Sequence, residues 1–431
     1  MEVDSGNPRY CTIDTLSSAL SANHAGDTAI AVYYGSSLST LTPVARNNDA
    51  YEAQLSEATF VAQPGTTYYI AVDCAPATAG VVRFRLRELI LEDAEWQGVL
   101  QPADPAQSLP GIVSLKTTRS GALSGQLTIG AKKFPFKGSW GANGRFRVVF
   151  PQLSKSGTVL ALPIELIIDG AGTSLGLYTQ LILPNQSIAG GLGRVTPFSA
   201  SNASPERGAY SLVILDNDTI GSGGIRYTVS PTGLVKGAGF MGDGQPIIFG
   251  SRLTEPFSSD IRQFAIHLPL FSGAGCLNGY IYCSPVESGS FFMNYLRPPQ
   301  SGAAFYPLGF RMEVDARGAL YTRPRPGQRV LGLLDPAGVG RLEFAHTPNE
   351  FTGFMESLTL GANNQFVFTN PAIRKPRMKI DLATGMISGS INEPPGRTRK
   401  LRGIVARFGD MPVAFGLCTG TTRTGSFGIF Q

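Results

Sequence analysis

The sequence predicts an all-β protein made of tandem antiparallel β-sandwich or barrel-like domains, and three observations support that fold class. Hydrophobic and polar residues alternate with a period of two in segments such as 83–87, 145–148 and 225–229, as half-buried strands require. Glycine (52 of 431 residues) and proline (30) exceed their usual shares of ~7% and ~5%, which indicates many turns. Only residues 87–99, around Trp96, are compatible with a short helix, and a linker is the alternative there.

Turn signals recur between the strand candidates. The pairs Asn143-Gly144, Asp243-Gly244 and Asn278-Gly279 are typical of hairpins, because their residues tolerate a positive φ. We therefore expect a tight turn at each of these three places.

An internal repeat gives the domain organisation. The pattern Ser/Thr-Gly-x3-Gly begins at Gly121, Gly233 and Gly385, counted at its first glycine, and another glycine follows 13, 13 or 14 residues after the second. We expect each copy to be a turn followed by a hairpin, with the second glycine where two backbones pass closely. The copies start 112 and 152 residues apart, so each belongs to a domain-sized module rather than to a solenoid repeat.

The length of 431 residues favours two to four domains. The expected boundaries are a β-sandwich at 1–88, a linker at 89–108, and three β-modules at 109–207, 208–300 and 301–431.

Charge and hydropathy exclude two classes of partner. Lys and Arg number 36 against 31 Asp and Glu, and a net charge of +5 spread over the chain is far from the concentrated basic patch of a nucleic-acid-binding protein. No apolar stretch approaches the ~18 residues of a membrane-spanning helix, and the first residues show no signal peptide.

Five cysteines are too sparse and too irregular to define a disulfide framework or a metal site. Buried free thiols are the expected state, and Cys11 to Cys74 is the one bridge worth testing. If residues 278–279 form a two-residue hairpin, Cys276 and Cys283 lie about 7–8 Å apart on a diagonal, too far for an easy disulfide. The sequence leaves the redox state open for Cys11, Cys74, Cys276, Cys283 and Cys418.

Residues 11–87 differ from the rest of the chain. Asp27-Thr28 through Tyr33, the triplet 47–49 (Asn-Asn-Asp) and the run 64–73 (PGTTYYIAVD) resemble the bacterial pre-peptidase C-terminal (PPC) domain, a small jelly-roll-like β-sandwich appended to exported proteins. The strands that normally precede the stretch 12–15 (TIDT) are missing, which predicts an N-terminally truncated PPC domain. The resemblance implies export and an extracellular or cell-surface location.

Residues 109–431 resemble, more loosely, the repetitive C-terminal β-domains of large exported proteins from Verrucomicrobia-like bacteria. The stretches that carry this likeness are 305–314, 327–335 and 383–430. It implies export and architecture, and it implies no biochemical activity.

Two catalytic motifs occur formally, and neither has the surroundings its chemistry needs. Residues 172–176 fit the G-x-S-x-G nucleophile elbow, but another strand follows where a helix is required, and the chain holds only three histidines. Residues 237–242 fit G-x-G-x-x-G, but a turn follows instead of the helix that would receive a pyrophosphate. We therefore expect no enzyme within this chain and no catalytic residues.

A calcium site is the metal hypothesis for the PPC-like domain. Asp27, Asn47, Asp49 and Asp73 carry the carboxylate and amide oxygens that Ca²⁺ prefers and lie near strand ends; some PPC domains bind calcium, with varying ligands. The alternative is that these residues only form turns. Residues 216–218 (Asp-Asn-Asp) resemble part of a calcium loop but lack its later glutamate.

Exposed aromatic rings are the ligand-binding hypothesis. The doublets Tyr33-Tyr34 and Tyr68-Tyr69 must each split between the two faces of a strand. Outward rings of Tyr34 and Tyr69, with Trp140, would stack on sugars or on a partner protein, whereas core packing is the alternative. The ladder Arg83, Arg85 and Arg87 is expected to form a solvated outer face that discourages edge-to-edge pairing.

These features together predict a non-catalytic exported or cell-surface protein, or a fragment of one, with modules acting as spacers or adhesive binding units for polysaccharide or a cell-surface protein. The alternative is the accessory C-terminal region of a secreted hydrolase with its catalytic domain upstream.

Overall fold

The computed structural model is built almost entirely of β-strands, which confirms the predicted all-β fold class. It describes residues 6–430 apart from 17, 21–26, 51–54, 75–79, 103–109, 142–143, 151–163, 174–175, 184–185, 216–219, 256–260, 333–336, 346–352, 370, 394–395 and 410. No helix within this described part is long and apolar enough to cross a membrane. The chain divides into two compact units, one chiefly of residues 1–194 and the other chiefly of residues 195–431.

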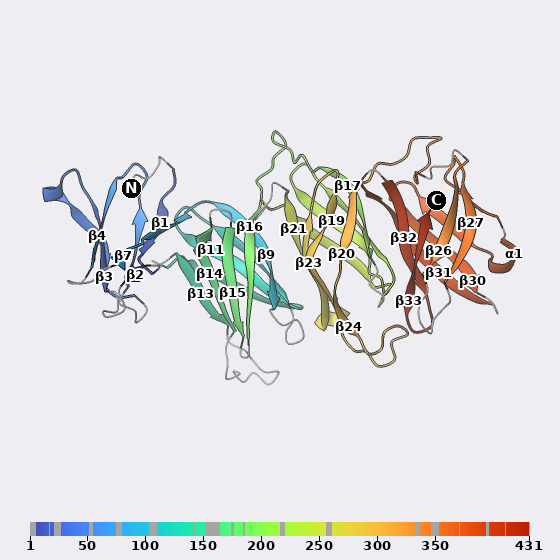
Figure 1. Cartoon of the computed structure of the whole chain (residues 1–431), viewed down its shortest axis with the longest axis horizontal. Helices are drawn as coiled ribbons and strands as arrows, with labels where there is room; N and C mark the ends of the chain where they lie inside the picture. The colour runs from blue at the N-terminus through green and yellow to red at the C-terminus, as the bar shows by residue number, and fades with distance from the viewer. Residues whose placement is uncertain are drawn as a thin grey trace. The chain divides into compact units, whose positions relative to one another are not determined.

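A small β-sandwich forms the N-terminal part of the first unit (Figure 1). One sheet joins β5 (Glu57–Ala62), β1 (Arg9–Asp14) and β8 (Arg85–Ile90); the other joins β4 (Thr42–Asn47), β3 (Thr28–Tyr34) and β6 (Tyr68–Cys74); and β2 (Ala19–Leu20) pairs with β7 (Gly80–Val81). The inward residues of both sheets share one core, to which Cys11, Ile13, Ile30, Val32, Phe60 and Tyr68 contribute. The period-two pattern read in the sequence thus separates the core face of each strand from its outer face.

The first unit also contains an up-and-down sheet that curls into a barrel. Its strands are β9 (Ala94–Pro102), β10 (Gly111–Thr117), β11 (Ala122–Ile129), β12 (Lys132–Ser139), β13 (Arg145–Phe150), β14 (Ile164–Thr173), β15 (Gly176–Leu183) and β16 (Gln186–Arg194). Each strand pairs with its neighbour in the sequence except β12 with β13, and β16 returns to pair with β9. The barrel therefore has a single seam, and the rings of Phe136 and Phe146, 5.6 Å apart, bridge it.

The sequence predicted a linker or a short helix where the structure has strand β9. The stretch 89–108 was expected to be a linker, and 87–99 to be either a linker or a short helix. Instead β8 and β9 are strands, and β9 is the closing strand of the barrel because it pairs with both β10 and β16. Its Trp96 is buried and donates its ring N–H to the hydroxyl of Thr117 at 3.1 Å.

The second barrel repeats this architecture in the second unit. Its strands are β17 (Gly208–Ile214), β18 (Gly223–Val229), β19 (Leu234–Phe240), β20 (Pro246–Arg252), β21 (Gln263–Leu270), β22 (Gly275–Tyr282), β23 (Ser288–Arg297), β24 (Phe310–Glu313) and β25 (Ala316–Leu320). β25 closes on β17, and the seam falls between β20 and β21, where the rings of Phe249 and Phe264 lie 6.2 Å apart. The barrel takes β24 and β25 from beyond residue 300, the expected end of this module.

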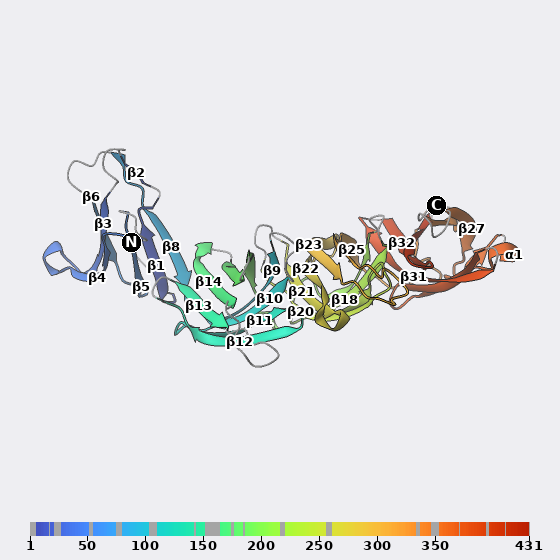
Figure 2. The ribbon, with the colours of Figure 1, turned by 90° about the horizontal axis from the view of Figure 1, so that it is seen from below.

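The third barrel completes the chain. Its strands are β26 (Val339–Phe344), β27 (Phe354–Leu360), β28 (Phe366–Phe368), β29 (Arg377–Asp381), β30 (Met386–Glu393), β31 (Arg397–Phe408), β32 (Met411–Thr419) and β33 (Thr424–Phe430). β33 closes on β26, and the seam between β28 and β29 holds the single helical turn α1 (Pro371–Arg374). Figure 2 shows this sheet curling from β27 round to β31.

The first glycine of each repeat has the expected role in a turn, and the second lies against a neighbouring backbone at Gly125 and Gly389 but against the Phe249 ring at Gly237. Gly121, Gly233 and Gly385 lie in turns with φ of +80°, +72° and +72°, and a strand begins directly after each turn. In the first two barrels the hairpin that follows ends at the seam. The third copy instead begins one strand after the seam, which explains its longer spacing. The matching position in the third barrel is Gly353, before β27, where Ser357 replaces the second glycine.

Two of the expected turns have different outcomes. Asp243-Gly244 forms a tight turn between β19 and β20, with the Gly244 N–H bonded to the Met241 carbonyl at 2.8 Å. The turn expected at Asn278-Gly279 is wrong, because β22 runs straight through it and carries only a β-bulge there. The bulge lets the chain continue as a strand where an Asn-Gly pair usually reverses it.

Polar contacts join the second and third barrels within the second unit. The Thr424 hydroxyl donates to the Gly242 carbonyl at 2.6 Å and accepts the Gly221 N–H at 3.1 Å, and the Tyr306 hydroxyl lies 2.8 Å from it. Close by, the buried carboxylate of Asp243 pairs with Arg297 at 2.5 Å. Because these polar and charged groups are buried, removing one partner of a pair would leave the other without a hydrogen bond and would lower the stability of the fold.

The repeat glycines predict a position-specific effect on stability. A Cβ at Gly237 would lie 2.1 Å from the ring of Phe249, which is packed in the core, whereas a Cβ at Gly250 in the same hairpin meets nothing closer than 3.8 Å. Gly237→Ala should therefore lower the free energy of unfolding by about 1–3 kcal/mol, as overpacking of a core does. Gly250→Ala is the matched control and should change it by less than about 0.5 kcal/mol. Urea unfolding, monitored by tyrosine and tryptophan fluorescence, measures both free energies. Equal effects of the two substitutions would contradict the conclusion that Gly237 is crowded and Gly250 is not.

Candidate binding site at the mouth of the third barrel

Alternation along β31 places its side chains on two surfaces. Leu401 and Val405 face the interior of the third barrel, whereas Ile404 and Ala406 face outward and pack against Val213 of the second barrel. The inward row continues by the same alternation to Arg407. A charged side chain therefore stands at the end of the barrel's apolar interior, which we call the mouth.

Residues 321–332, which we call the strap, lead from β25 toward β26 and lie across the mouth. At one end the Tyr321 hydroxyl donates to the Leu382 carbonyl at 2.9 Å. At the other end the buried side chain of Asn364 accepts the Val330 N–H at 2.7 Å and donates to the Gln328 carbonyl at 2.8 Å. Val330 and Leu331 are buried in the barrel core. The strap is therefore anchored at both ends, and it is not a free loop.

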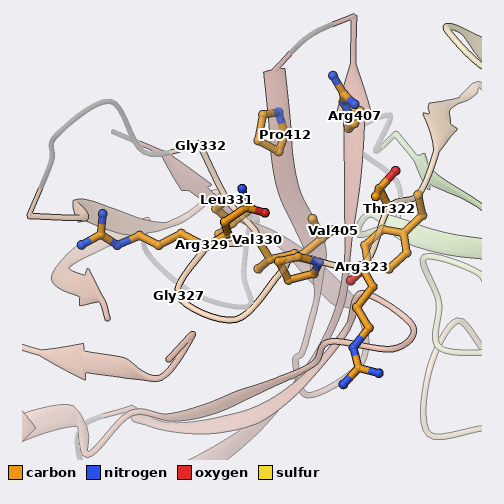
Figure 3. Close-up of a pocket in the computed structure, with 13 residues that line it drawn as sticks. Thr322, Arg323, Gly327, Arg329, Val330, Leu331, Gly332, Val405, Arg407 and Pro412 are labelled. Atoms are coloured by element: carbon orange, nitrogen blue, oxygen red, sulfur yellow. The ribbon is translucent and has the colours of Figure 1, made fainter. Parts of the chain in front are cut away.

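A cavity of about 530 Å³ lies between the strap and strands β31 and β32 (Figure 3). This volume is within the ~300–1,000 Å³ typical of small-ligand sites, which often occupy the mouths of β-barrels. Apolar side chains of Val330, Leu331, Val405 and Pro412 form part of its lining. The polar lining is supplied by Tyr321, Thr322, Arg323, Gln328, Arg329 and Arg407.

The three arginines lie at different points of the rim. In Figure 3 the side chains of Arg323, Arg329 and Arg407 extend in different directions and do not converge on one point. Arg329 is fixed by its Nε–H, which donates to the Leu360 carbonyl at 2.6 Å, whereas Arg323 is exposed. Each guanidinium offers several N–H donors in a planar fork. Such a rim suits a ligand with several hydroxyl or carboxylate groups better than a single small anion.

Positive charge is concentrated in the part of the chain that holds this site. Residues 321–431 contain 14 Lys and Arg against seven Asp and Glu, a net +7, whereas residues 1–320 contain 22 against 24, a net −2. The net +5 of the chain is therefore not evenly spread, contrary to the reading of the whole sequence. Residues 321–431 therefore have a field that favours anionic ligands.

The structure shows how the residues of the calcium hypothesis are engaged and on which strands they lie. The Asn47 amide donates to the Asp49 carbonyl at 3.0 Å and its oxygen accepts the Glu57 N–H at 3.0 Å, so both ends of that side chain are engaged. Asn47 and Asp73 lie on β4 and β6, which flank β3 on opposite sides. No three His, Cys, Asp or Glu side chains come together as a metal site anywhere in the described ranges. Asp27, Asp49 and Asp73 therefore do not form a shared set of ligands.

The aromatic residues of the sugar-stacking hypothesis are also apart. Tyr69 is 43% exposed and Tyr34 is 46% exposed, but the register pairs Tyr69 with Tyr33 and Tyr34 with Tyr68, so Tyr34 and Tyr69 lie on opposite faces of their sheet. Trp140 is only 5% exposed, so the expectation that its ring meets a ligand is wrong. The Trp140 side chain is buried, which favours the alternative of packing over ligand contact.

The arginine ladder is solvated at Arg83 and Arg85, as expected, but Arg85 and Arg87 on β8 also belong to an ion-pair network. Arg85 and Arg87 both reach the fully buried carboxylate of Asp14, at 3.2 and 3.3 Å, and Arg87 also pairs with Glu57 at 2.6 Å. The acidic partners come from β1 and β5, which flank each other in the same sheet. Sequence reading missed them because they are distant along the chain.

The candidate catalytic motifs lie in hairpins. Ser174 and Leu175 of the G-x-S-x-G motif fall outside the described residues, but Thr173 pairs with Gly176 and strand β15 follows directly. The G-x-G-x-x-G stretch runs along β19 into the Asp243-Gly244 turn. Residues 216–218 lie outside the described residues. Neither glycine motif is followed by the helix that its chemistry requires.

The other nucleophile and base candidates are buried. Burial raises the pKa of the Cys11 and Cys276 thiols to about 12 and that of Cys283 to about 11, so these thiols stay protonated at neutral pH. Burial lowers the pKa of His267, and its Nδ1 lies 3.0 Å from the Asn278 amide. Within the described ranges, these groups form no nucleophile–base pair.

Comparison with known proteins gives no family. No protein-family model and no curated protein sequence matches the chain. Isotype 1 transferrin binding protein B from serogroup B Neisseria meningitidis is similar over 96% of this chain and 88% of that one, at 10% identity and a TM-score of 0.20. A transferrin binding protein B double mutant from Haemophilus parasuis Hp5 is similar over 96% and 85%, at 9% identity and a TM-score of 0.18. TM-scores this low do not indicate a shared fold, so neither likeness bears on the function of this chain.

Thiol accessibility tests the burial of the cysteines. All five are free thiols in the structure, and only Cys74 is partly exposed. At pH 8 the native protein should react rapidly with one equivalent of 5,5′-dithiobis(2-nitrobenzoate), and the remaining thiols should react only after unfolding in guanidinium chloride. Cys74→Ser is the control and should leave the native protein unreactive. Rapid reaction of a second thiol would contradict the packing described here.

Proposed function

We propose that this chain is a non-catalytic exported or cell-surface protein whose β-modules act as spacers and binding units, and that the mouth of the third barrel binds polysaccharide. The observation that carries the proposal is the cavity beneath the strap. It is built by segments far apart in the sequence, it is fixed by the buried Asn364, and it combines an apolar floor with a polar rim.

The chemistry of the cavity suits a sugar. Pyranose rings have apolar C–H faces and hydroxyl edges, and Val405 and Pro412 offer contacts to the faces. Arg323, Thr322 and Gln328 offer hydrogen bonds to the edges. Small-ligand sites commonly combine such an apolar lining with a few polar groups.

Export and the PPC-like identity of residues 11–87 belong to this proposal. Their support is the motif likeness in the sequence together with a two-sheet sandwich at the same residues. In this proposal the sandwich and the first two barrels are the spacer modules of the chain.

A matched pair of arginines on the strap tests the binding proposal. Arg323 lines the cavity, whereas Arg325, two residues along and also exposed, does not. Arg323→Ala should weaken retention on the best-bound member of a panel of cellulose, chitin, xylan and dextran about tenfold, since a hydrogen bond to a charged group contributes about 1.5–3 kcal/mol. Arg325→Ala should change it less than twofold. Affinity electrophoresis and pull-down measure both, and absence of retention, or equal loss in the two variants, would reject the mouth as a polysaccharide site.

Calcium removal is a separate prediction. Because Asp27, Asp49 and Asp73 form no shared ligand set, EDTA should leave both the melting temperature and the polysaccharide retention unchanged. Isothermal titration of the chelated protein with CaCl₂ should show no saturable heat. A rise in melting temperature of several degrees with millimolar CaCl₂ would instead favour the calcium hypothesis.

A further inference from the structure

The outer surface of β29, β30 and β31 carries cations in two neighbouring rows. The register aligns Arg377 with Ser390 and Ser390 with Lys400, and in the next row Lys379 with Ser388 and Ser388 with Arg402. Residues aligned in this way project to the same side of a sheet. We call this set the basic face: Arg377, Lys379, Ser388, Ser390, Lys400 and Arg402.

Sheet geometry fixes the spacing of the four cations. Neighbouring strands lie about 4.8 Å apart, and residues two apart along a strand lie about 6.8 Å apart. The Cα atoms of the four basic residues therefore occupy the corners of a rectangle of about 10 by 7 Å, with the two serines in the middle. A single small anion cannot reach all four corners at once, whereas an extended chain that carries anionic groups can.

The cations of the basic face are available. Arg377, Lys379 and Lys400 are exposed, and the described part of the chain gives none of them an ion pair. Neither Ser388 nor Ser390 has a side-chain hydrogen bond to another described residue.

The remaining charged groups beside the face are already engaged. Arg402 lies with its guanidinium 4.5 Å from the centre of the Phe240 ring, which holds that cation in place. The acidic group nearest along the strand, Asp381, accepts bonds from the Thr384 hydroxyl at 2.7 Å and the Ala383 N–H at 2.9 Å. The face therefore has a fixed corner and three exposed cations.

Protection of a sheet edge explains only half of this arrangement. β29 is the last strand on one side of the seam, and basic residues on such an edge discourage pairing with other chains. Lys400 and Arg402, however, lie on β31, which is paired on both sides by β30 and β32. Arg402 is explained in part by its contact with Phe240, whereas the exposed Lys400, aligned with the cation at the edge, calls for another explanation.

We propose that the basic face binds an extended acidic polysaccharide, one whose sugar units carry carboxylate or sulfate groups. The inference rests on the proposed function, that this chain binds polysaccharide, and it adds a second surface and a ligand charge. Charge complementarity supports this proposal. Three cations of the basic face have no ion-pair partner among the described residues, and the face lies in the part of the chain with a net charge of +7. The serine hydroxyls between the rows can bond to sugar hydroxyls.

Nucleic acid is the other polyanion that fits the charge, and the face lacks what it needs. Proteins that bind single strands stack the bases on aromatic rings. The outward residues of β29, β30 and β31 in these two rows are only arginine, lysine and serine. The face thus matches the backbone charge of a polyanion and offers no stacking surface for bases.

Two double variants of equal charge change test the inference. Lys379→Ala/Lys400→Ala removes two cations of the basic face, and Lys132→Ala/Lys133→Ala removes two exposed lysines of β12 in the first barrel. The dissociation constant for polygalacturonate, measured by biolayer interferometry in 50 mM NaCl, should rise at least tenfold in the first variant and less than twofold in the second. Binding by the natural chain should weaken at least tenfold in 300 mM NaCl.

Each remaining outcome has a defined meaning. Equal weakening in both variants means that bulk charge alone is responsible and overturns the inference, as does absence of binding by the natural chain. Tighter binding of single-stranded DNA than of polygalacturonate, lost in the Lys379/Lys400 variant, also overturns it in favour of nucleic acid. If that variant has a lowered melting temperature, Lys379→Gln/Lys400→Gln should give the same tenfold loss with an unchanged melting temperature.

The two binding surfaces can fail separately. Arg323→Ala should leave polygalacturonate binding within twofold of the natural chain while it weakens retention of the neutral polysaccharide. Loss of polygalacturonate binding in the Lys379/Lys400 variant without any retention of neutral polysaccharide would uphold the basic face and reject the mouth.

Discussion

Closure of each sheet on itself is the constraint on which the rest of this structure depends. In every barrel the last strand pairs with the first, as Arg194 with Trp96, Leu320 with Tyr210, and Phe430 with Arg341. Closure leaves only one seam of unpaired backbone, which neighbouring side chains cover, and it turns the alternation of each strand into an inside and an outside. Every functional feature proposed here follows from that division of the strand into two faces.

The third barrel shows how one strand can serve three surfaces. Inward residues of β31 build the core and end in Arg407 at the mouth, where the strap encloses a cavity. Some of its outward residues, Ile404 and Ala406, are buried against the second barrel. The outward Arg402 and Lys400 lie further along and belong to the basic face. Packing against the second barrel fixes the strand, so the mouth and the basic face are held by the same contacts.

The fold could be read from the sequence because its signals are local. Period-two alternation and turn-forming glycines act between neighbouring residues, and Gly121, Gly233 and Gly385 have the positive φ that their turn positions require. Signals that depend on distant partners were not readable. Asn278-Gly279 has the composition of a turn, yet pairing with β21 and β23 keeps it in a strand. The local sequence around Arg87 is typical of a solvated side chain, yet Arg87 forms ion pairs with Asp14 and Glu57 from two other strands.

The sequence by itself determined the fold class, the repeat and the strand content, because these arise from short-range steric and hydrophobic preferences. Only the tertiary structure decided where the barrels close, which rings are buried and which charges share a surface. Trp140 is buried, and Lys379 and Lys400 share one face although they are 21 positions apart. The physical reason is that strand register and sheet closure are set by hydrogen bonds between segments that no local pattern connects.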